Sequence, residues 1–504
     1  MSFASRKALS VFRRPAFWLW LMVAAYTAFF LAYNLASHAA FDTSALDLGI
    51  YDQVVWNTAH GRIMAYSAEP WYSNNFLGTH LQPILILLAP VYWIWSDPRA
   101  LIVLQSLAIA ASAFLVYFLA SRRLKWPLAA LALTFAYLMY PALQAVTRFE
   151  FHPEAFEPFL FLAAFALYEI WRGRIEVSRL PRRRAAALFF LSIVLALMVK
   201  EDVALVVAAL GAYLWIARRE RRLGPALIGI AVLWFGIGMF FVMPQFHSGE
   251  GSPFLSYYAY LGKTPAEMVH TLLAQPQIPI EALLAPSNAD MLLSLLIPLG
   301  FLPLLSPGLL LIALPTLVSY GLSTSAFMHR MEMFHYAATV IPWFTLAAIY
   351  GLGRWYDQKR VRWLAGLAAR APRLPLAVLL VCSFAYQGAR GFTPLSRWYQ
   401  WPQVGEHERL GLRLMQEIPP GAPLVAQDRL YPHLSQRESI SFLWPSDASA
   451  EYIVLDVSDA ALTNGNKLTE WLKDQVLGQS AYGLELSRDG FVLLKRGAPR
   501  RELS

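Results

Sequence analysis

The chain has 504 residues, of which 57% are hydrophobic and only 15% are charged. This balance excludes an ordinary soluble protein and predicts a protein embedded in a membrane. The net charge of +9 does not indicate nucleic-acid binding, because the basic residues gather at the ends of apolar runs, where they orient membrane helices. The single cysteine, Cys382, lies inside an apolar run, which excludes an intrachain disulfide.

Near-uncharged runs long enough to cross a bilayer core, roughly 20 helical residues, recur along the chain. They are apolar on every face, which favours helices over the alternating strands of a barrel. We predict about eleven transmembrane helices, the first of them a retained helix rather than a cleaved signal peptide. They cover residues 16–36, 98–120, 126–146, 155–171, 185–199, 203–217, 224–244, 290–305, 307–322, 336–351 and 374–390.

The charges of the loops orient these helices. With the N-terminus in the cytoplasm, the cytoplasmic loops hold 23 Lys and Arg, and the opposite side up to residue 389 holds 6. This asymmetry follows the positive-inside rule, and one missed helix would invert every later loop. The same topology places all 10 histidines on the outside. We therefore expect a multi-pass protein of the cell membrane whose chemistry lies on the extracytoplasmic face.

The expected transmembrane domain covers residues 1–390 and includes a long outside loop at 37–97. In this loop, residues 49–60 and 81–95 are apolar and aromatic but too short to span, which is typical of helices lying in the membrane interface. Residues 391–504 predict a small extracytoplasmic α/β domain. Its expected elements are strands at 423–427, 440–442 and 452–457, a helix at 468–477, and a hairpin of 482–486 with 490–495.

The outside loop carries the first candidate residues, Asp47, Asp52 and His80. A carboxylate at a partly dehydrated interface can act as a general base toward a sugar hydroxyl or hold a divalent cation, and histidine can do either. On one helix Asp47 and Asp52 would lie about 140° apart, so the loop must fold if both act. The alternative is that these aspartates are solvated helix caps.

Three further clusters lie at helix starts on the same face. Glu154 has an adequate structural explanation, because Pro153 suits the first helical position and the helix dipole favours an acid there. The charged turn at residues 200–202 interrupts an apolar stretch, and charged groups so placed are functional candidates, although a solvated turn is the alternative. The remaining candidates in these clusters are Arg148, His152, Lys200, Glu201, Arg330, His335 and Tyr336.

Several motifs resemble a large family of predicted prokaryotic membrane proteins of unknown function. They lie at residues 46–53, 78–83, 151–154 and 199–202 and in the tail at 418–420 and 432–435. That family is similar in turn to the GT-C superfamily of glycosyltransferases, which use polyprenyl-phosphate-linked sugars. The resemblance implies an all-α polytopic bundle of the GT-C type with interfacial helices, followed by the small α/β domain.

The resemblance also implies roles for the candidate residues. Asp47 matches the acid that acts as general base or metal ligand, with Asp52 as the second choice. Cations near the departing phosphate would be Arg148, Lys200, Arg330 and His335, and further substrate contacts His80, His152, Glu154, Glu201 and Tyr336. A divalent metal, if one is needed, would be held by Asp47, His80, His152 and Glu154. The chain departs from the superfamily pattern where Leu48 follows Asp47 in place of a second acid.

The expected function is transfer of a sugar from a polyprenyl-phosphate donor in the bilayer to an extracytoplasmic glycan, lipid or protein, with the outside tail domain as a site for the acceptor. A transporter or flippase is the main alternative, but such proteins keep ionisable groups near the midplane and often repeat as halves. A non-catalytic scaffold presenting the tail domain is a third reading. It predicts that Asp47→Asn and Lys200→Ala leave the cellular phenotype intact.

Overall fold

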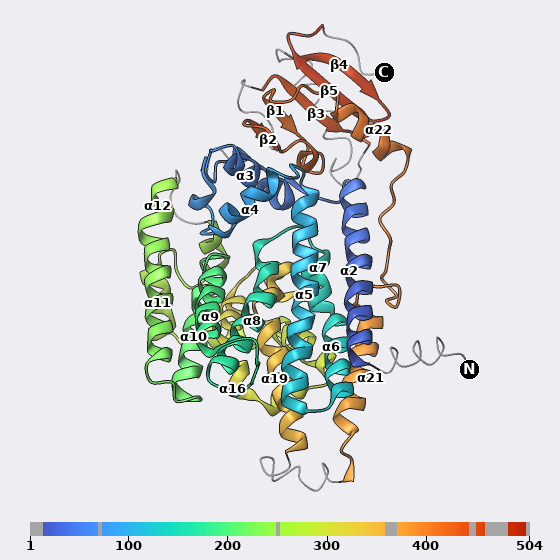
Figure 1. The fold of residues 1–504 in the computed structure, drawn as a ribbon. Helices are drawn as coiled ribbons and strands as arrows, with labels where there is room; N and C mark the ends of the chain where they lie inside the picture. The colour runs from blue at the N-terminus through green and yellow to red at the C-terminus, as the bar shows by residue number, and fades with distance from the viewer. Residues whose placement is uncertain are drawn as a thin grey trace, which may run out of the picture.

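A computed structural model describes residues 14–68, 73–247, 253–357, 370–442, 450–458 and 482–499 of the chain. The molecule is an elongated helical bundle with a small sheet at one end (Figure 1). Helix α2 begins near the N-terminal end of the described chain and runs to the opposite end of the bundle, where the sheet lies. The start of α2 and the C-terminal sheet therefore lie toward opposite ends of the molecule, and the orientation of the chain in the membrane stays a prediction.

Most helices of the bundle agree in position with the expected apolar runs, whereas α13, α14 and α18 lie in segments for which no helix was expected. Many begin with proline at their first or second position, where its missing N–H and fixed φ cost nothing. The bundle helices are α2 (Pro15–Ala39), α5 (Arg99–Leu124), α6 (Pro127–Leu138), α7 (Pro141–Arg148), α8 (Glu157–Trp171), α9 (Arg182–Leu197), α10 (Val203–Ile216), α11 (Leu223–Ile237), α12 (Met243–Phe246), α13 (Pro265–Ala274), α14 (Gln277–Leu283), α15 (Pro286–Leu296), α16 (Pro307–Leu310), α17 (Leu314–Leu322), α18 (Ala326–His329), α19 (Ile341–Tyr356) and α21 (Leu374–Arg390).

The predicted number of spans is not confirmed. Within the described ranges, 3 helices are long and apolar enough to cross a membrane, namely α2, α5 and the helix Leu223–Phe246. The number rises to 5 if each of two bent pairs is one span, and α6 with α7 forms one such pair, bent by 51°. Proline explains that bend, because Pro141 cannot continue the hydrogen-bond ladder of α6. Many of the other apolar helices are simply shorter than a straight span.

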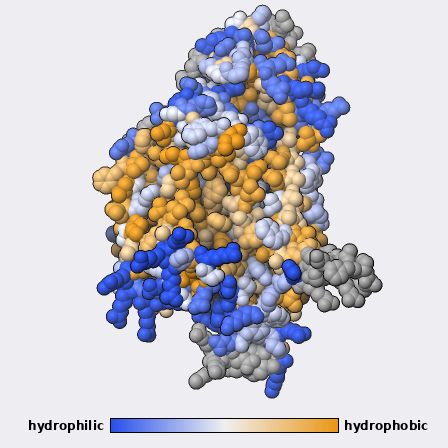
Figure 2. Space-filling view, viewed as in Figure 1, coloured by the Kyte–Doolittle hydropathy of each residue, from blue (hydrophilic) through white to orange (hydrophobic). Residues whose placement is uncertain are grey.

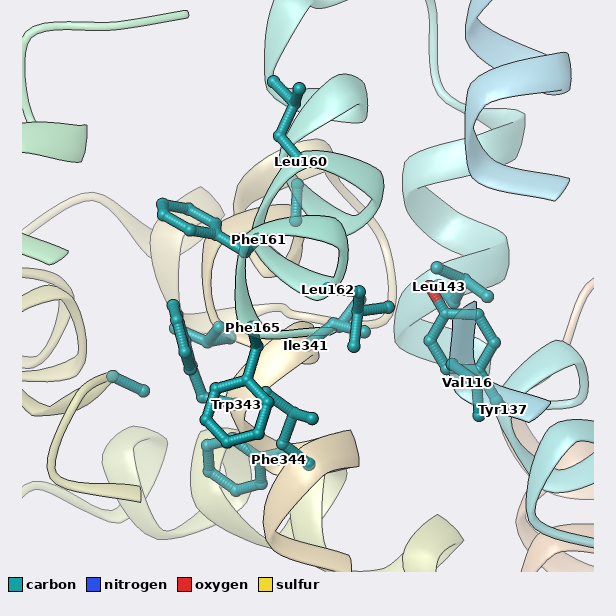
Figure 3. Packing of buried hydrophobic residues seen from close by; sticks show 14 of the residues in the cluster. Val116, Tyr137, Leu143, Leu160, Phe161, Leu162, Phe165, Ile341, Trp343 and Phe344 are labelled. Atoms are coloured by element: carbon teal, nitrogen blue, oxygen red, sulfur yellow. The ribbon is translucent and has the colours of Figure 1, made fainter. Parts of the chain in front are cut away.

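Aromatic and aliphatic side chains from distant helices fill the middle of the bundle. The rings of Phe161 on α8 and Trp343 on α19 lie 5.1 Å apart, and both side chains are fully buried. Figure 3 shows these residues with Phe165 and Phe344 beside them. Apolar residues also dominate the outer surface midway along the molecule, whereas hydrophilic residues gather at its two ends (Figure 2). An apolar belt of this kind is what a bilayer requires.

The two expected interfacial segments form α3 (Ile50–Ala59) and α4 (Ile84–Tyr92). These helices lie between the bundle and the sheet (Figure 1). They share one hydrophobic cluster with the C-terminal region, to which Leu48, Val54 and Tyr431 belong. Gly49 allows the close approach, since a Cβ there would lie 2.5 Å from the Tyr431 ring. The outside loop and the C-terminal region therefore pack as one body.

The C-terminal region forms a five-stranded sheet with the order β2-β1-β3-β5-β4. Strands β1 (Leu424–Ala426), β2 (Ile440–Ser441) and β3 (Tyr452–Asp456) are parallel, and β4 (Tyr482–Arg488) and β5 (Phe491–Arg496) form an antiparallel hairpin. Asp489 and Gly490 turn this hairpin with positive φ angles, as an Asp-Gly pair favours. Helix α22 (Glu406–Met415) was not anticipated, and the expected helix at 468–477 lies outside the described residues.

Candidate functional site

Four short segments meet at the end of the bundle that faces α3 and α4. They are the π-helical turn η1 (Ala45–Gly49), the 3-10 turn η3 (Pro153–Phe156), the turn between α9 and α10, and the 3-10 turn η8 (His335–Thr339). Contacts among their charged side chains form what we call the Asp47 network. Its members are Asp47, His152, Glu154, Lys200 and His335.

Asp47 and His152 form a direct pair. The Nε2 atom of His152 lies 3.1 Å from Oδ1 of Asp47, and its Nδ1 atom lies 3.1 Å from the backbone carbonyl oxygen of Glu150. A carbonyl and a carboxylate only accept, so both ring nitrogens donate and His152 is an imidazolium. Burial by itself would lower the pKa of His152, but the Asp47 carboxylate, together with the Glu154 charge and the Glu150 carbonyl, raises it overall. The pair is thus a carboxylate held by a buried cation.

Backbone contacts fix the turn that carries Asp47. The Glu150 carboxylate accepts hydrogen bonds from the backbone N–H of Ser44 at 2.7 Å and of Leu48 at 3.1 Å. Asp428 of the C-terminal region accepts another from the N–H of Ala45 at 2.9 Å. Burial, and then the nearby Asp47 charge, raise the pKa of Glu150. Glu150 was not among the predicted site residues, although it immediately precedes the motif at residues 151–154.

Glu154 and Lys200 form a buried ion pair with 2.7 Å between Oε1 and Nζ. Burial would raise the pKa of Glu154, but the charges of Lys200 and His152 lower it overall. Burial would likewise lower the pKa of Lys200, yet Glu154 and Asp202 hold it well above its usual value. Both groups therefore stay charged at neutral pH, and the Gln82 amide donates to the second Glu154 oxygen at 3.4 Å.

His335 adds a neutral ring to the network. Its imidazole stacks on that of His152, with centroids 3.7 Å apart and planes inclined by 14°. Its Nε2 atom lies 3.7 Å from Oε1 of Glu154. Burial, then the positive charges of His152 and Lys200, hold the pKa of His335 well below its usual value. The centre of the Tyr336 ring lies 4.3 Å from the centre of the His335 ring.

A second pair attaches the outside loop to the turn between α9 and α10. Nδ1 of His80 lies 2.9 Å from Oε1 of Glu201, and the backbone N–H of Leu81 donates to the other oxygen at 3.0 Å. Burial would raise the pKa of Glu201, but His80 lowers it overall. This clamp holds Lys200, the residue next to Glu201, at the level of Glu154.

The structure does not bring three other candidates into the Asp47 network. Asp52 is fully buried in α3 and accepts hydrogen bonds from Tyr92 at 2.5 Å and from Ser435 at 2.6 Å, so it holds the outside loop to the C-terminal region. Arg148 donates from Nε to the Tyr33 hydroxyl at 2.9 Å and lines a separate hollow. Arg330 is exposed. Their assumed roles toward substrate remain predictions.

The residues expected to hold a metal do not converge as a ligand set. Throughout the ranges that the structure describes, no group of three or more His, Cys, Asp or Glu side chains is arranged to hold an ion. Glu154 is paired with Lys200, and His80 is paired with Glu201. The four predicted ligands thus do not fit a metal in this arrangement, and metal dependence stays a prediction.

Asp47 is the part of the network most open to solvent. Its side chain is 28% exposed, compared with 6% for His152 and 4% for Glu154. Lys200 is 16% exposed. Asp47 and Lys200 are therefore the more accessible members of the two pairs, and the buried His152 and Glu154 side chains hold them in position.

Comparisons with known proteins agree with this architecture. A family model described as "Predicted membrane protein (DUF2079)" matches residues 37–493. The chain is also similar to the crystal structure of ArnT from Cupriavidus metallidurans bound to undecaprenyl phosphate, with 13% identity, a TM-score of 0.51, and coverage of 95% of this chain and 97% of that one. The apo structure of the same protein gives 13% identity, a TM-score of 0.48, and coverage of 94% and 98%. No curated protein sequence matches the chain significantly.

The family match confirms the expected family of predicted membrane proteins, and the likeness to ArnT agrees with the expected type of fold. At 13% identity the likeness shows a shared fold. Fold does not by itself determine the reaction, which has to be argued from the site.

Proposed function

This chain belongs to the DUF2079 family of predicted membrane proteins, and from its fold and its site we propose that it is a membrane glycosyltransferase. It would move a sugar from a polyprenyl-phosphate donor to an acceptor hydroxyl on the extracytoplasmic side of the plasma membrane. The observation that carries the proposal is the Asp47 carboxylate, which is partly exposed and held 3.1 Å from a buried imidazolium in a GT-C-like fold.

In the proposed reaction Asp47 is the general base. The acceptor oxygen attacks the anomeric carbon of the donor, and the acceptor proton passes to the Asp47 carboxylate. The bond between the anomeric carbon and the phosphate oxygen breaks, and polyprenyl phosphate leaves with the electron pair. His152 orients the carboxylate that takes the proton, and we regard it as a positioning residue because only 6% of its side chain is exposed.

Lys200 is the proposed contact for the departing phosphate. Negative charge grows on that phosphate in the transition state, and a cation already in place stabilises it. The ammonium now has Glu154 as its partner, so a phosphate at the edge of Lys200 would compete with or share this carboxylate. His335 and Tyr336 stand beside the same pair and complete this side of the proposed donor site.

The place of the network in the fold supports a lipid-linked donor. The network contacts the outside loop that carries α3 and α4, since the Gln82 amide donates to Glu154 and His80 pairs with the neighbouring Glu201. A polyprenyl tail could remain in the bilayer while its sugar phosphate reaches Asp47. Two bent helix pairs favour a transporter as the second candidate, because broken helices frequently line transport sites. A transporter would move the lipid-linked sugar across liposomes without forming a new glycoside.

The test is a transfer assay in proteoliposomes with radiolabelled polyprenyl-phosphate sugars and membrane-derived acceptors. Asp47→Asn removes the base but keeps the shape, and loss of general-base catalysis lowers the rate by about 10²–10⁴-fold. Asp97→Asn is the matched control, since Asp97 lies on the same side and pairs with Arg99 instead. Transfer at the wild-type rate by Asp47→Asn would overturn the proposed role of this residue.

A further inference from the structure

A hollow of about 300 Å³ lies where α2, the end of α7 and the outside loop meet the segment after α21, and no member of the Asp47 network lines it. This volume is at the lower end of the range typical of ligand pockets, roughly 300–1,000 Å³. We call it the strap pocket, because residues 391–405, which we name the strap, connect α21 to α22 and form much of its wall. Its lining residues are Tyr33, Asp42, Arg148, Phe392, Trp398, Tyr399, Gln400, Trp401, Pro402 and Gln403.

The strap pocket is built around a held guanidinium. Arg148 donates from Nε to the Tyr33 hydroxyl at 2.9 Å. Its guanidinium carbon lies 5.6 Å from the centre of the Tyr33 ring and 4.8 Å from that of Phe392. The Trp401 ring stands edge-on to Tyr33 at 5.8 Å and 88°. The guanidinium has five N–H donors, so its bond to Tyr33 leaves other donors for a ligand.

The chemistry of the lining favours a saccharide. A sugar ring has an apolar C–H face that can cover an aromatic ring, and hydroxyl groups that both donate and accept hydrogen bonds. Trp398 is 66% exposed and Trp401 39% exposed, so both rings have apolar surface to cover. Arg148 supplies donors, Asp42 supplies acceptors, and Gln400 and Gln403 supply both. The Asp42 carboxylate, although 3.9 Å from Arg429, makes the pocket less suited to a bare anion.

The strap pocket is connected to Asp47 through two short segments. Asp42 belongs to the same loop as Asp47, and Arg148, the last residue of α7, precedes His152 by four residues. Between these two pairs of residues, the N–H of Ser44 donates to Glu150 at 2.7 Å and joins the segments. Residues 42–47 and 148–152 therefore run side by side. The strap pocket lies at one end of this pair of segments, and the Asp47–His152 contact lies at the other.

We propose that the strap pocket binds a sugar unit of the acceptor. The word acceptor rests on the proposed transferase function, whereas saccharide binding by the pocket does not. The strap leads through α22 to the C-terminal sheet. The pocket would set which glycans are used, because it lies apart from the Asp47 carboxylate.

The binding test is saturation-transfer difference NMR on the full chain in detergent, with the disaccharides chitobiose and maltose as probes. We expect transfer to the ring protons of at least one disaccharide in the wild type. Trp401→Leu and Trp398→Leu should each weaken binding by about tenfold, the loss expected for one aromatic contact. Trp93→Leu is the matched control, because Trp93 is an exposed tryptophan on α4's end outside the pocket.

Three results would overturn the pocket proposal. They are no saccharide signal in the wild type, a signal that Trp401→Leu and Trp398→Leu leave unchanged, or a response confined to short-chain phosphatidylglycerol, which would make these tryptophans membrane anchors. A melting temperature equal to that of the wild type shows that each variant is folded. If saccharide binding is lost in the strap variants while Asp47→Asn still transfers sugar, the pocket proposal stands and the proposed base fails.

A kinetic measurement distinguishes the proposed role of Asp47 from the proposed role of the strap pocket. If Asp47 is the base and the strap pocket holds acceptor, strap variants raise the acceptor KM about tenfold at an unchanged kcat, and Asp47→Asn lowers kcat. A strap variant that lowered kcat without changing the acceptor KM would contradict the pocket's role, while leaving the role of Asp47 intact.

Discussion

Replacement of Lys200 by methionine tests the electrostatic core of the site. The change keeps most of the unbranched side chain but leaves the Glu154 carboxylate, which is 4% exposed, without its 2.7 Å partner. Removing one member of a buried ion pair costs about 3–5 kcal/mol, because the other charge stays buried without compensation. We therefore expect Lys200→Met to lower the free energy of unfolding by an amount in this range.

Two neighbours place the expected loss toward the lower limit. Gln82 already donates to the second oxygen of Glu154 at 3.4 Å, and His335 lies 3.7 Å from the first. The charge of Lys200 is one cause of the low pKa of His335, so its removal makes protonation of His335 easier. A protonated His335 can then pair with Glu154. We expect a loss of about 3 kcal/mol, smaller in acid than at neutral pH.

The measurement is reversible unfolding in mixed micelles with increasing SDS, followed by circular dichroism. Lys263→Met is the control, because Lys263 is an exposed lysine outside the network and should change stability by less than about 0.5 kcal/mol. In the double variant with Glu154→Gln the two losses should not add, with a coupling of about 2–3 kcal/mol. Additive losses, or a Lys200→Met loss equal to that of the control, would refute the description of this pair.

Three further predictions address the network, the packing and the orientation. Because Asp47 raises the pKa of His152, transfer should fall as pH rises through that raised pKa, and the pH–rate profile of His152→Gln should lack this limb. Burial raises the pKa of Asp52 to about 7, so the folded state binds the proton more tightly than the unfolded state. The stabilisation by the protonated Asp52 is then present in acid and is lost as pH rises toward 7. In Asp52→Asn the melting temperature should therefore depend less on pH between pH 4 and 7. An unchanged slope would contradict the burial argument. A reporter fused after Arg397 should be extracytoplasmic. A cytosolic reporter would contradict the predicted membrane topology.

The local pattern of the sequence was sufficient for the secondary structure of most elements. Apolar runs bounded by charges and prolines predicted α21 to the residue and the starts of α2 and α5 to within one residue, because both features act within a few turns of chain. The predicted ends of α2 and α5 were three and four residues short. The Asp-Gly pair at 489–490 predicted the turn of the hairpin for the same reason. The number of spans did not follow, since many helices are short or bent and their crossing depends on the helices beside them.

The candidate site needed tertiary information. Asp47 and Asp52 look equivalent in the sequence, but Asp52 contacts Ser435, 383 residues away, and Asp47 contacts His152. Composition indicated which face would carry charge, since loop charges follow the direction of each crossing. Which carboxylate meets which cation was decided by packing, because an ion pair depends on distances between segments that only the folded bundle fixes.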